Sequence, residues 1–280
     1  MALAGHRTGR PVQEQGGAHV AGMRDAPRMY RALKRALPPV LNPYLQVTVE
    51  GLENIPEREP AILACNHLSF IDSLVLPMNV ARPVYFLGKA DYWDSWRTKW
   101  FFQGTGVVPL RRGKGEGDAS LATGVEILRS GELLGIYPEG TRSPDGRLYR
   151  GKTGPVRMAL EAEVPIIPCG IHGTDMALPT GARVPKRGPV LMRYGSPLDL
   201  SRYYERRADP FVLRSATDEL MYEIMLLSGQ EYVDEYGAKV KSGDVDVSGV
   251  LETPSGTMAD DPADGDDPDA DGDDTDQQRG

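Results

Sequence analysis

The chain has 280 residues, of which 40% are hydrophobic and 26% charged, so it is long and apolar enough to fold around a substantial core. Its net charge of −8 is concentrated at the C-terminus, where from Asp244 onward thirteen acidic residues accompany one basic residue, which leaves a net charge of +4 before that point. No run approaches eighteen consecutive apolar residues, and the basic N-terminus lacks an apolar stretch, so we expect neither a membrane-spanning helix nor a secretory signal peptide.

Composition divides the chain into three parts. Residues 1–23 are rich in Gly, Ala, Gln and His without a hydrophobic period, and residues 243–280 consist largely of Asp, Gly, Pro and Ala. Neither segment can bury enough apolar surface to fold, so we predict that both are disordered. We expect residues 24–242 to form the folded domain. Cys65 and Cys169 lie in apolar runs of this domain, which indicates reduced core residues of a cytoplasmic protein and not a disulfide framework.

The folded region is predicted to open with a helix over residues 27–37, which Asp25 can cap and which Pro38-Pro39 should stop. Hydrophobic patterning then predicts strands at 46–49, 61–65 and 83–87, followed by an aromatic helix from about residue 89 to residue 102.

The second half of the domain continues the alternation. A helix is predicted to begin near Asp118 and to end at Ser130-Gly131. Pro165 and Pro168 interrupt the strand predicted over 164–171, which argues against ordinary pairing in the centre of a sheet. The remaining predictions are strands at 133–137 and 190–194 and helices at 155–162 and 210–227. This spacing predicts an α/β fold in which helices flank a mixed, largely parallel sheet.

The segment Asn66-His67-Leu68-Ser69-Phe70-Ile71-Asp72 follows the strand predicted at 61–65 and leads into a helix. A carboxylate five residues after a histidine can hold the imidazole Nδ1–H and support the imidazolium that forms when Nε2 takes a proton. The same residues also have a structural interpretation. Ser69-x-x-Asp72 is a capping-box pattern, in which Ser69 caps the helix and Asp72 bonds back to its amide. The segment alone leaves both interpretations open.

A second polar segment, Tyr137-Pro138-Glu139-Gly140-Thr141-Arg142-Ser143, follows the strand predicted at 133–137. Ligands bind at the carboxyl ends of strands in open α/β sheets. Gly140 permits close approach of the backbone, Thr141 offers a hydroxyl, and Arg142 offers a bidentate guanidinium for phosphate or carboxylate. Taken alone, the segment is equally compatible with a polar turn that carries an Arg–Glu surface pair.

Two further segments are weak signals when taken singly. Gly104-x-Gly106-Val107-Val108-Pro109-Leu110-Arg111-Arg112 indicates a strand end that delivers two arginines, although paired arginines more often form a solvated edge. Val164-Pro165-Ile166-Ile167-Pro168 is by default a structural strand.

Together and in this order, the four segments resemble the 1-acyl-glycerol-3-phosphate acyltransferase (lysophosphatidate acyltransferase) family. They match its Asn-His-x4-Asp, Gly-x5-Arg, Pro-Glu-Gly-Thr-Arg-Ser and Val-Pro-Ile-x-Pro boxes, and the resemblance covers about residues 45–230. Two positions depart from the family pattern. Tyr137 stands where Phe is commoner, and Arg111 stands where an acidic residue usually precedes the second-box arginine, Arg112.

The resemblance implies the glycerolipid acyltransferase fold and transfer of an acyl chain from an acyl-CoA or acyl-carrier-protein thioester to the sn-2 hydroxyl of 1-acyl-glycerol 3-phosphate, giving phosphatidic acid. It implies that His67 is the general base, that Asp72 orients it, and that the hydroxyl attacks the thioester directly. The other implied site residues are Arg112, Gly140, Thr141 and Arg142 around the acceptor phosphate, Glu139 to position their loop, and Asn66 and Ser69 in support. It implies no cofactor, and the four scattered histidines form no metal-ligand cluster.

Other functions are compatible with parts of the sequence. The acceptor can be glycerol 3-phosphate or another lysophospholipid, since the same phosphate-binding residues would serve. Residues 146–153 match the phosphate-loop pattern of NTPases, but the strand that should directly precede such a loop ends near Tyr137. A covalent hydrolase would need a nucleophile such as Ser69 or Cys65, yet there is no G-x-S-x-G elbow. A non-catalytic phospholipid-binding module would use the same arginines, and it would tolerate substitution of His67.

Amphiphilic substrates imply a peripheral protein on the cytoplasmic face of the cell membrane. The first helix is predicted to carry a basic flank and an apolar stripe that suit an anionic leaflet, formed by Arg24, Arg28, Arg31, Lys34 and Arg35 and by Met29, Leu33 and Leu37. Docking of this helix on the domain's own core is the alternative. Trp93, Trp96 and Trp100 gather on one helical face and belong either to the core or to an interfacial belt. An acyl-carrier protein is a further candidate partner, and nucleic acid is not.

Overall fold

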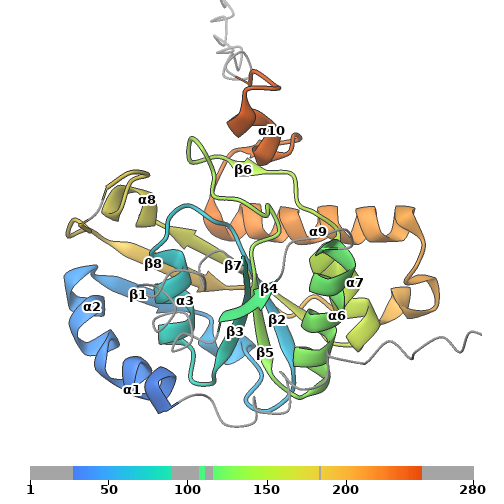
Figure 1. Ribbon diagram of the computed structural model, residues 1–280, viewed down its shortest axis with the longest axis horizontal. Coiled ribbons are helices and arrows are strands. Elements are labelled where there is room, and N and C mark those ends of the chain that lie inside the picture. Colours follow the sequence, from blue (N-terminus) through green and yellow to red (C-terminus); the bar gives the residue numbers. More distant parts are fainter. Residues whose placement is uncertain (1–27, 90–106, 111–115, 183, 248–280) are drawn as a thin grey trace, which may run out of the picture. The chain divides into compact units, whose positions relative to one another are not determined.

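The computed structural model describes residues 28–89, 107–110, 116–182 and 184–247. The chain divides into two compact units, residues 1–245 and residues 246–280, and the description of the second unit is limited to Asp246 and Val247. The first unit is an α/β fold built on a seven-stranded sheet (Figure 1), which confirms the predicted fold class.

The central sheet has the strand order β1-β8-β7-β2-β5-β3-β4. Its strands are β1 (Val47–Glu50), β2 (Ala61–Cys65), β3 (Val84–Lys89), β4 (Val107–Leu110), β5 (Leu133–Ile136), β7 (Ile166–His172) and β8 (Val190–Tyr194). Every neighbouring pair is parallel except β7 and β8, which run antiparallel. The central strands read as continuous apolar runs because the sheet is covered on both faces.

Helices cover the two faces of the sheet (Figure 1). On one face, α6 (Glu116–Arg129), α7 (Gly154–Ala162) and α9 (Pro210–Ser228) share a core with Ile62 and Ala64 of β2. On the other face, α3 (Asp72–Asn79) packs against Leu63 and Cys65 of the same strand. Alternate residues of β2 therefore enter opposite cores, as the two-residue period of a strand requires.

The carboxyl ends of the central strands meet at one edge of the sheet. β2 pairs in parallel with both β5 and β7, so these three strands end on the same side. Asn66-His67 directly follows β2, and Tyr137-Pro138-Glu139 directly follows β5. The fold thus brings the first two polar segments together at the edge where open α/β sheets bind ligands.

Prolines bear on two predictions, and the second, about Pro168, was wrong. The first helix ends before Pro38-Pro39 as predicted, since α1 is Arg28–Ala36, but a further helix that was not predicted, α2 (Pro38–Tyr44), begins at Pro38. Proline is tolerated in the first helical turn, where its missing N–H has no intrahelical acceptor. Pro168 lies in β7, a central strand, and it is accommodated one residue before the stretch that pairs with β8, Cys169–His172.

Helix α1 is docked on the domain through Tyr30. This side chain is buried, and its hydroxyl accepts the backbone N–H of Val84 at 3.1 Å. Lys34 donates to the carbonyl of Arg82 and lies over the Tyr30 ring. Burial raises the pKa of Tyr30 to about 12 and lowers the pKa of Lys34 to about 8. The alternative of docking on the domain's own core therefore holds for this face of α1, while Arg31 and Arg35 remain exposed. Asp25 and Arg24 lie outside the described residues.

The C-terminal part of the first unit returns to the carboxyl edge of the sheet. Two short strands, β6 (Leu148–Tyr149) and β9 (Tyr232–Val233), pair in parallel, and α10 (Gly237–Ser242) follows β9. The remaining elements are α8 (Thr174–Ala177) and two short 3₁₀ turns, Leu52–Asn54 and Ser201–Arg206. Within the described ranges, no helix combines the length and apolar character needed to cross a membrane.

Candidate active site

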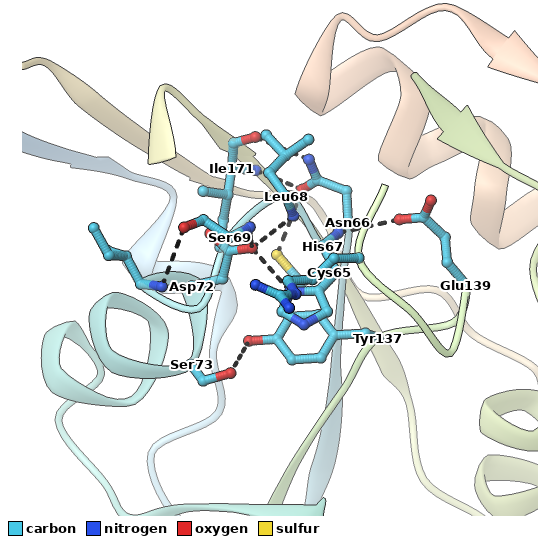
Figure 2. Close-up of polar contacts among 12 residues, drawn as sticks. Cys65, Asn66, His67, Leu68, Ser69, Asp72, Ser73, Tyr137, Glu139 and Ile171 are labelled. Carbon is cyan, nitrogen blue, oxygen red and sulfur yellow. Dashed lines mark hydrogen bonds and ion pairs between the residues drawn. The ribbon is translucent and has the colours of Figure 1, made fainter. Parts of the chain in front are cut away.

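His67 lies just beyond β2 and bonds to Asp72 at the start of α3 (Figure 2). The distance between His67 Nδ1 and Asp72 Oδ2 is 2.9 Å, the carboxylate is fully buried, and the imidazole is 16% exposed. Because Nδ1 is engaged by the carboxylate, Nε2 is the ring nitrogen left to exchange a proton with a ligand. The structure places the predicted pair in direct contact.

The Asp72 carboxylate also closes the turn before α3. Its Oδ2 accepts the backbone N–H groups of Leu68 at 2.7 Å and Ser69 at 2.8 Å. The bond from Ser69 is the return bond of the predicted capping box. The other half of that prediction was wrong, because the Ser69 hydroxyl does not cap α3 and the N–H of Asp72 donates to the backbone carbonyl of Ser69 instead. One oxygen of Asp72 thus serves both the backbone and the imidazole. The Ser69 hydroxyl donates to the carbonyl of Leu178 at 2.8 Å. Ser69 is therefore engaged away from His67, which argues against its use as a nucleophile activated by that ring.

The ring of Tyr137 stacks on the imidazole of His67 (Figure 2). The ring centroids are 3.9 Å apart and the planes differ by 10°. The Tyr137 hydroxyl lies 3.2 Å from Oγ of Ser73 in α3. Burial, together with the charge on Asp72, raises the pKa of Tyr137 well above its usual value, so the phenol remains neutral. Tyr137 thus covers one face of the imidazole, while Asp72 holds its edge at Nδ1. The position of Tyr137 in the motif did not predict this contact.

Glu139 ties the two polar segments together. Its Oε1 accepts the backbone N–H of His67 and its Oε2 accepts that of Tyr149, each at 3.1 Å. The side chain is 2% exposed, and burial raises its pKa to about 8, against the two backbone donors that lower it. The negative charge of Asp72 raises the pKa further. Glu139 therefore holds the loop through two backbone hydrogen bonds, and its carboxyl group points into the protein and not toward solvent.

Asn66 links the end of β2 to the end of β7. Its Oδ1 accepts the N–H of Ile171 at 2.7 Å, and its Nδ2 donates to the carbonyl of the same residue at 2.9 Å and to Oε1 of Gln230 at 2.7 Å. The side chain is fully buried. Asn66 therefore supports the position of the neighbouring His67, as a buried amide with its hydrogen bonds satisfied.

Arg142 lies beside the histidine segment. The backbone N–H of the next residue, Ser143, donates to the carbonyl of His67 at 2.7 Å. Arg142 is half-buried, and its guanidinium forms no hydrogen bond or ion pair with the residues that the structure describes. Gly140 has φ +69°, the left-handed conformation that favours glycine. The loop therefore carries an unpaired guanidinium, among the described residues, on a main chain that is hydrogen-bonded to the histidine segment.

Two lysines outside the four motif segments lie against the loop formed by residues 140–142. A Cβ atom at Gly140 would lie 2.8 Å from Nζ of Lys152, so the absence of a side chain there makes room for this ammonium. Nζ of Lys241, in α10, lies 3.4 Å from Oγ1 of Thr141 and 3.3 Å from the carbonyl oxygen of Arg142. Lys241 is a hundred residues from Thr141 in the chain and had no signal in the motif pattern.

Residues 146–153 do not form a nucleotide-binding loop. Such a loop needs free backbone N–H groups for phosphate. Here the N–H groups of Leu148, Arg150 and Lys152 donate to the carbonyls of Glu231, Glu235 and Pro138. The N–H of Tyr149 is bound by Glu139.

Four of the predicted functional residues fall in the gaps between the described ranges. Arg112 and the three tryptophans, Trp93, Trp96 and Trp100, lie outside the described residues. Over the ranges that are described, the structure contains no group of three or more His, Cys, Asp or Glu side chains arranged to hold a metal ion.

Comparison with known proteins relates this part of the chain to a family. The acyltransferase family model matches residues 46–172, a range that includes both the histidine segment and the Glu139–Ser143 loop. Over this range the chain is similar to the acyltransferase family.

The chain is similar to named proteins from bacteria and plants. It is 34% identical over 142 residues to a chloroplast 1-acyl-sn-glycerol-3-phosphate acyltransferase of Arabidopsis thaliana, covering 50% of this chain and 40% of the relative. It is 28% identical over 175 residues to a Bacillus subtilis protein of the same name, covering 61% of this chain and 82% of the relative. The chain spans less than half the length of the first two plant relatives that it matches.

Among solved structures, the chain is similar to the 1-acyl-sn-glycerophosphate (LPA) acyltransferase PlsC of Thermotoga maritima. The TM-score is 0.49 at 25% sequence identity, and the match covers 72% of this chain and 85% of that chain.

Proposed function

We propose that this protein transfers an acyl chain from an acyl thioester to the sn-2 hydroxyl of 1-acyl-glycerol 3-phosphate, giving phosphatidic acid. One observation carries the proposal: a carboxylate-bound histidine and a free guanidinium lie on two loops whose main chains are hydrogen-bonded, Ser143 N–H to the carbonyl of His67. The names of the bacterial and plant relatives point to the same acceptor.

His67 acts as the general base. Asp72 holds Nδ1, so Nε2 takes the proton of the acceptor hydroxyl as that oxygen attacks the thioester carbonyl. A C–O bond forms, the C–S bond breaks, and the proton on Nε2 passes to the leaving thiolate. The buried carboxylate stabilises the transient imidazolium, and no acyl-enzyme is required. The Ser69 hydroxyl supports this direct route, since it is bound to a main-chain carbonyl away from the imidazole.

The acceptor phosphate binds at the Gly140–Arg142 loop. Arg142 offers two parallel N–H donors without an internal partner among the described residues, and Thr141 adds a hydroxyl. Glu139 fixes the loop by its two backbone bonds. Arg112 belongs to the same phosphate site in this proposal, on the strength of its place in the second box.

The donor is an acyl-CoA or an acyl-carrier-protein thioester, and no further cofactor takes part. Glycerol 3-phosphate and other lysophospholipids are the competing acceptors, and parallel assays with each acceptor decide among them.

The proposal places the protein peripherally on the cytoplasmic face of the cell membrane. Helix α2 exposes two apolar side chains, Val40 (73% accessible) and Tyr44 (43% accessible). The preceding helix α1 exposes two cations, Arg31 and Arg35. This combination suits an anionic leaflet. Buried, unbridged thiols at Cys65 and Cys169 suit a reducing compartment.

The test is an acyl-transfer assay of the full chain with 1-acyl-glycerol 3-phosphate and acyl thioesters, comparing wild type with His67→Ala. We expect activity to fall by about 100-fold or more, the effect of removing a general base, with thermal unfolding unchanged. His172→Ala is the matched control, because the only hydrogen bond of the His172 ring to a described residue is with the carbonyl of Leu227, so this variant should leave turnover intact.

Two results would contradict this proposal. Full activity of His67→Ala would remove the histidine from the reaction. Binding of the lysophospholipid by wild type without any acyl transfer would indicate a non-catalytic phospholipid-binding module.

A further inference from the structure

The C-terminal segment of the first unit, residues 230–245, is packed onto the loop proposed to bind the acceptor phosphate. β9 pairs with β6 immediately downstream of that loop, and the N–H groups of Leu148 and Arg150 donate to the carbonyls of Glu231 and Glu235 at 2.8 and 2.9 Å. Figure 1 shows α10 beyond β6 at this end of the domain.

Helix α10 packs closely against the domain at Gly237. This residue is buried, and a Cβ atom on it would lie 3.3 Å from Cγ of Tyr149 and 3.5 Å from Cγ2 of Thr141. The close contact fixes the helix one turn away from Lys241, whose ammonium therefore reaches the loop at Thr141 and Arg142.

Lys241 and Arg142 are held close together without an intervening acid among the described residues. Both contacts of the ammonium among the described residues are to neutral oxygens. Burial, and after it the charge of Arg142, lowers the pKa of Lys241. Two neighbouring cations repel each other unless an anion lies between them. A phosphate monoester, with up to two negative charges and three peripheral oxygens, is the anion that a guanidinium and an ammonium can share.

We propose that Lys241 is a second cation of the acceptor-phosphate site, so that α10 contributes directly to recognition of phosphomonoester lipids. The inference rests on the proposed function, and it adds a residue from outside the range matched by the acyltransferase family, residues 46–172. It also gives residues 230–245 a role, since they carry Lys241 to the loop.

The test measures binding of a water-soluble, short-chain 1-acyl-glycerol 3-phosphate and of its dephosphorylated counterpart by calorimetry, using the full chain. We expect Lys241→Met to weaken binding of the phosphorylated compound about tenfold, the effect of one charge-assisted hydrogen bond. Binding of the dephosphorylated compound should not change, and Lys241→Arg should restore most of the affinity. Thermal unfolding of each variant shows that α10 remains in place.

Lys239→Met is the matched control, since Lys239 lies on the same helix but its Nζ is 3.8 Å from Oε2 of Glu235. Equal affinities of wild type and Lys241→Met, an equal loss in Lys239→Met, or no preference of wild type for the phosphorylated compound would each overturn the inference. Acyl transfer is assayed on the same samples. Phosphate-dependent binding through Lys241 without acyl transfer by wild type would refute the proposed activity and leave the role of Lys241 supported.

Discussion

Oδ2 of Asp72 lies 2.9 Å from Nδ1 of His67 and simultaneously accepts the backbone N–H groups of Leu68 and Ser69. The orientation of the imidazole is therefore set by the main chain of the turn, through a carboxylate that is fully buried. A residue with two tasks of this kind can be tested by a substitution that preserves one of them.

Asp72→Asn preserves an oxygen that can accept the backbone donors, but it removes the charge that stabilises the imidazolium. We expect kcat to fall by about 100-fold or more, with little change in the KM of the acceptor. Steady-state kinetics checks this, with Asp175→Asn on α8 as a control outside the pair. If Asp72→Asn kept the wild-type kcat, the carboxylate would serve only to close the turn before α3.

Glu139 predicts a pH-dependent stability. Its pKa is raised from 4.5 to about 8, so between these values the folded protein keeps a proton that the unfolded chain has released. The free energy of unfolding should therefore fall as the pH rises through this interval, by at most about 1.4 kcal/mol per pH unit from this group.

Glu139→Gln removes that titration and turns an amide N–H₂ toward one of the two backbone donors. We expect the variant to be less stable by about 1–3 kcal/mol at pH 5 and the difference from wild type to shrink toward pH 8. Urea unfolding at several pH values measures both. A difference that is independent of pH would show that Glu139 is already ionised at pH 5.

Tyr137 combines a stacking contact with a hydrogen bond, and the two can be separated. Tyr137→Phe keeps the ring on His67 and removes only the bond to Ser73, so it should cost about 1 kcal/mol of stability and change kcat by less than about threefold. Tyr137→Ala removes the stacked face and should lower kcat further. Ser73→Ala completes a double-mutant cycle, and additive effects on stability would show that the 3.2 Å contact contributes nothing.

Gly170 in β7 lies directly against the backbone of α9. A Cβ atom at this position would be 2.5 Å from the carbonyl carbon of Leu227 and 2.7 Å from the amide nitrogen of Ser228. Because backbone atoms cannot move aside as a flexible side chain can, Gly170→Ala should lower the free energy of unfolding by about 1–3 kcal/mol.

The control for this prediction is Gly154→Ala at the start of α7, where a Cβ atom meets nothing within 4 Å and the change should stay within about 0.5 kcal/mol. Equal stability of the two variants would mean that α9 adjusts its position freely.

Strongly apolar segments were the easiest to predict. The strands at 61–65 and 190–194 have the predicted limits, because turn-forming residues bound both apolar runs. The resemblance to the acyltransferase family also implied that the segments after β2 and β5 share one site, and they do converge, since these parallel neighbouring strands end at one edge. Pro38-Pro39 marked the end of the first helix correctly, whereas Pro168 misled, because the effect of a missing N–H depends on which neighbour it would have faced.

Other parts of the site had no signal in the sequence. Two-residue strands such as β6 and β9 are too short to show a period, so their pairing could not be predicted. Lys241 reaches Thr141 only through that pairing, and Tyr137 is identifiable as a stacking partner only once β2 and β5 are placed side by side. Contacts between residues that are distant in the chain depend on the tertiary fold and not on local patterns.

The bond from Ser143 N–H to the carbonyl of His67 fixes the spacing of the two main chains that carry the proton acceptor and the cation. The Arg142 side chain has no hydrogen bond or ion pair with the described residues, so its rotamers can still move the guanidinium. The backbone therefore sets the region in which the hydroxyl and the phosphate of one acceptor can both be reached, and the arginine rotamer sets the distance between them.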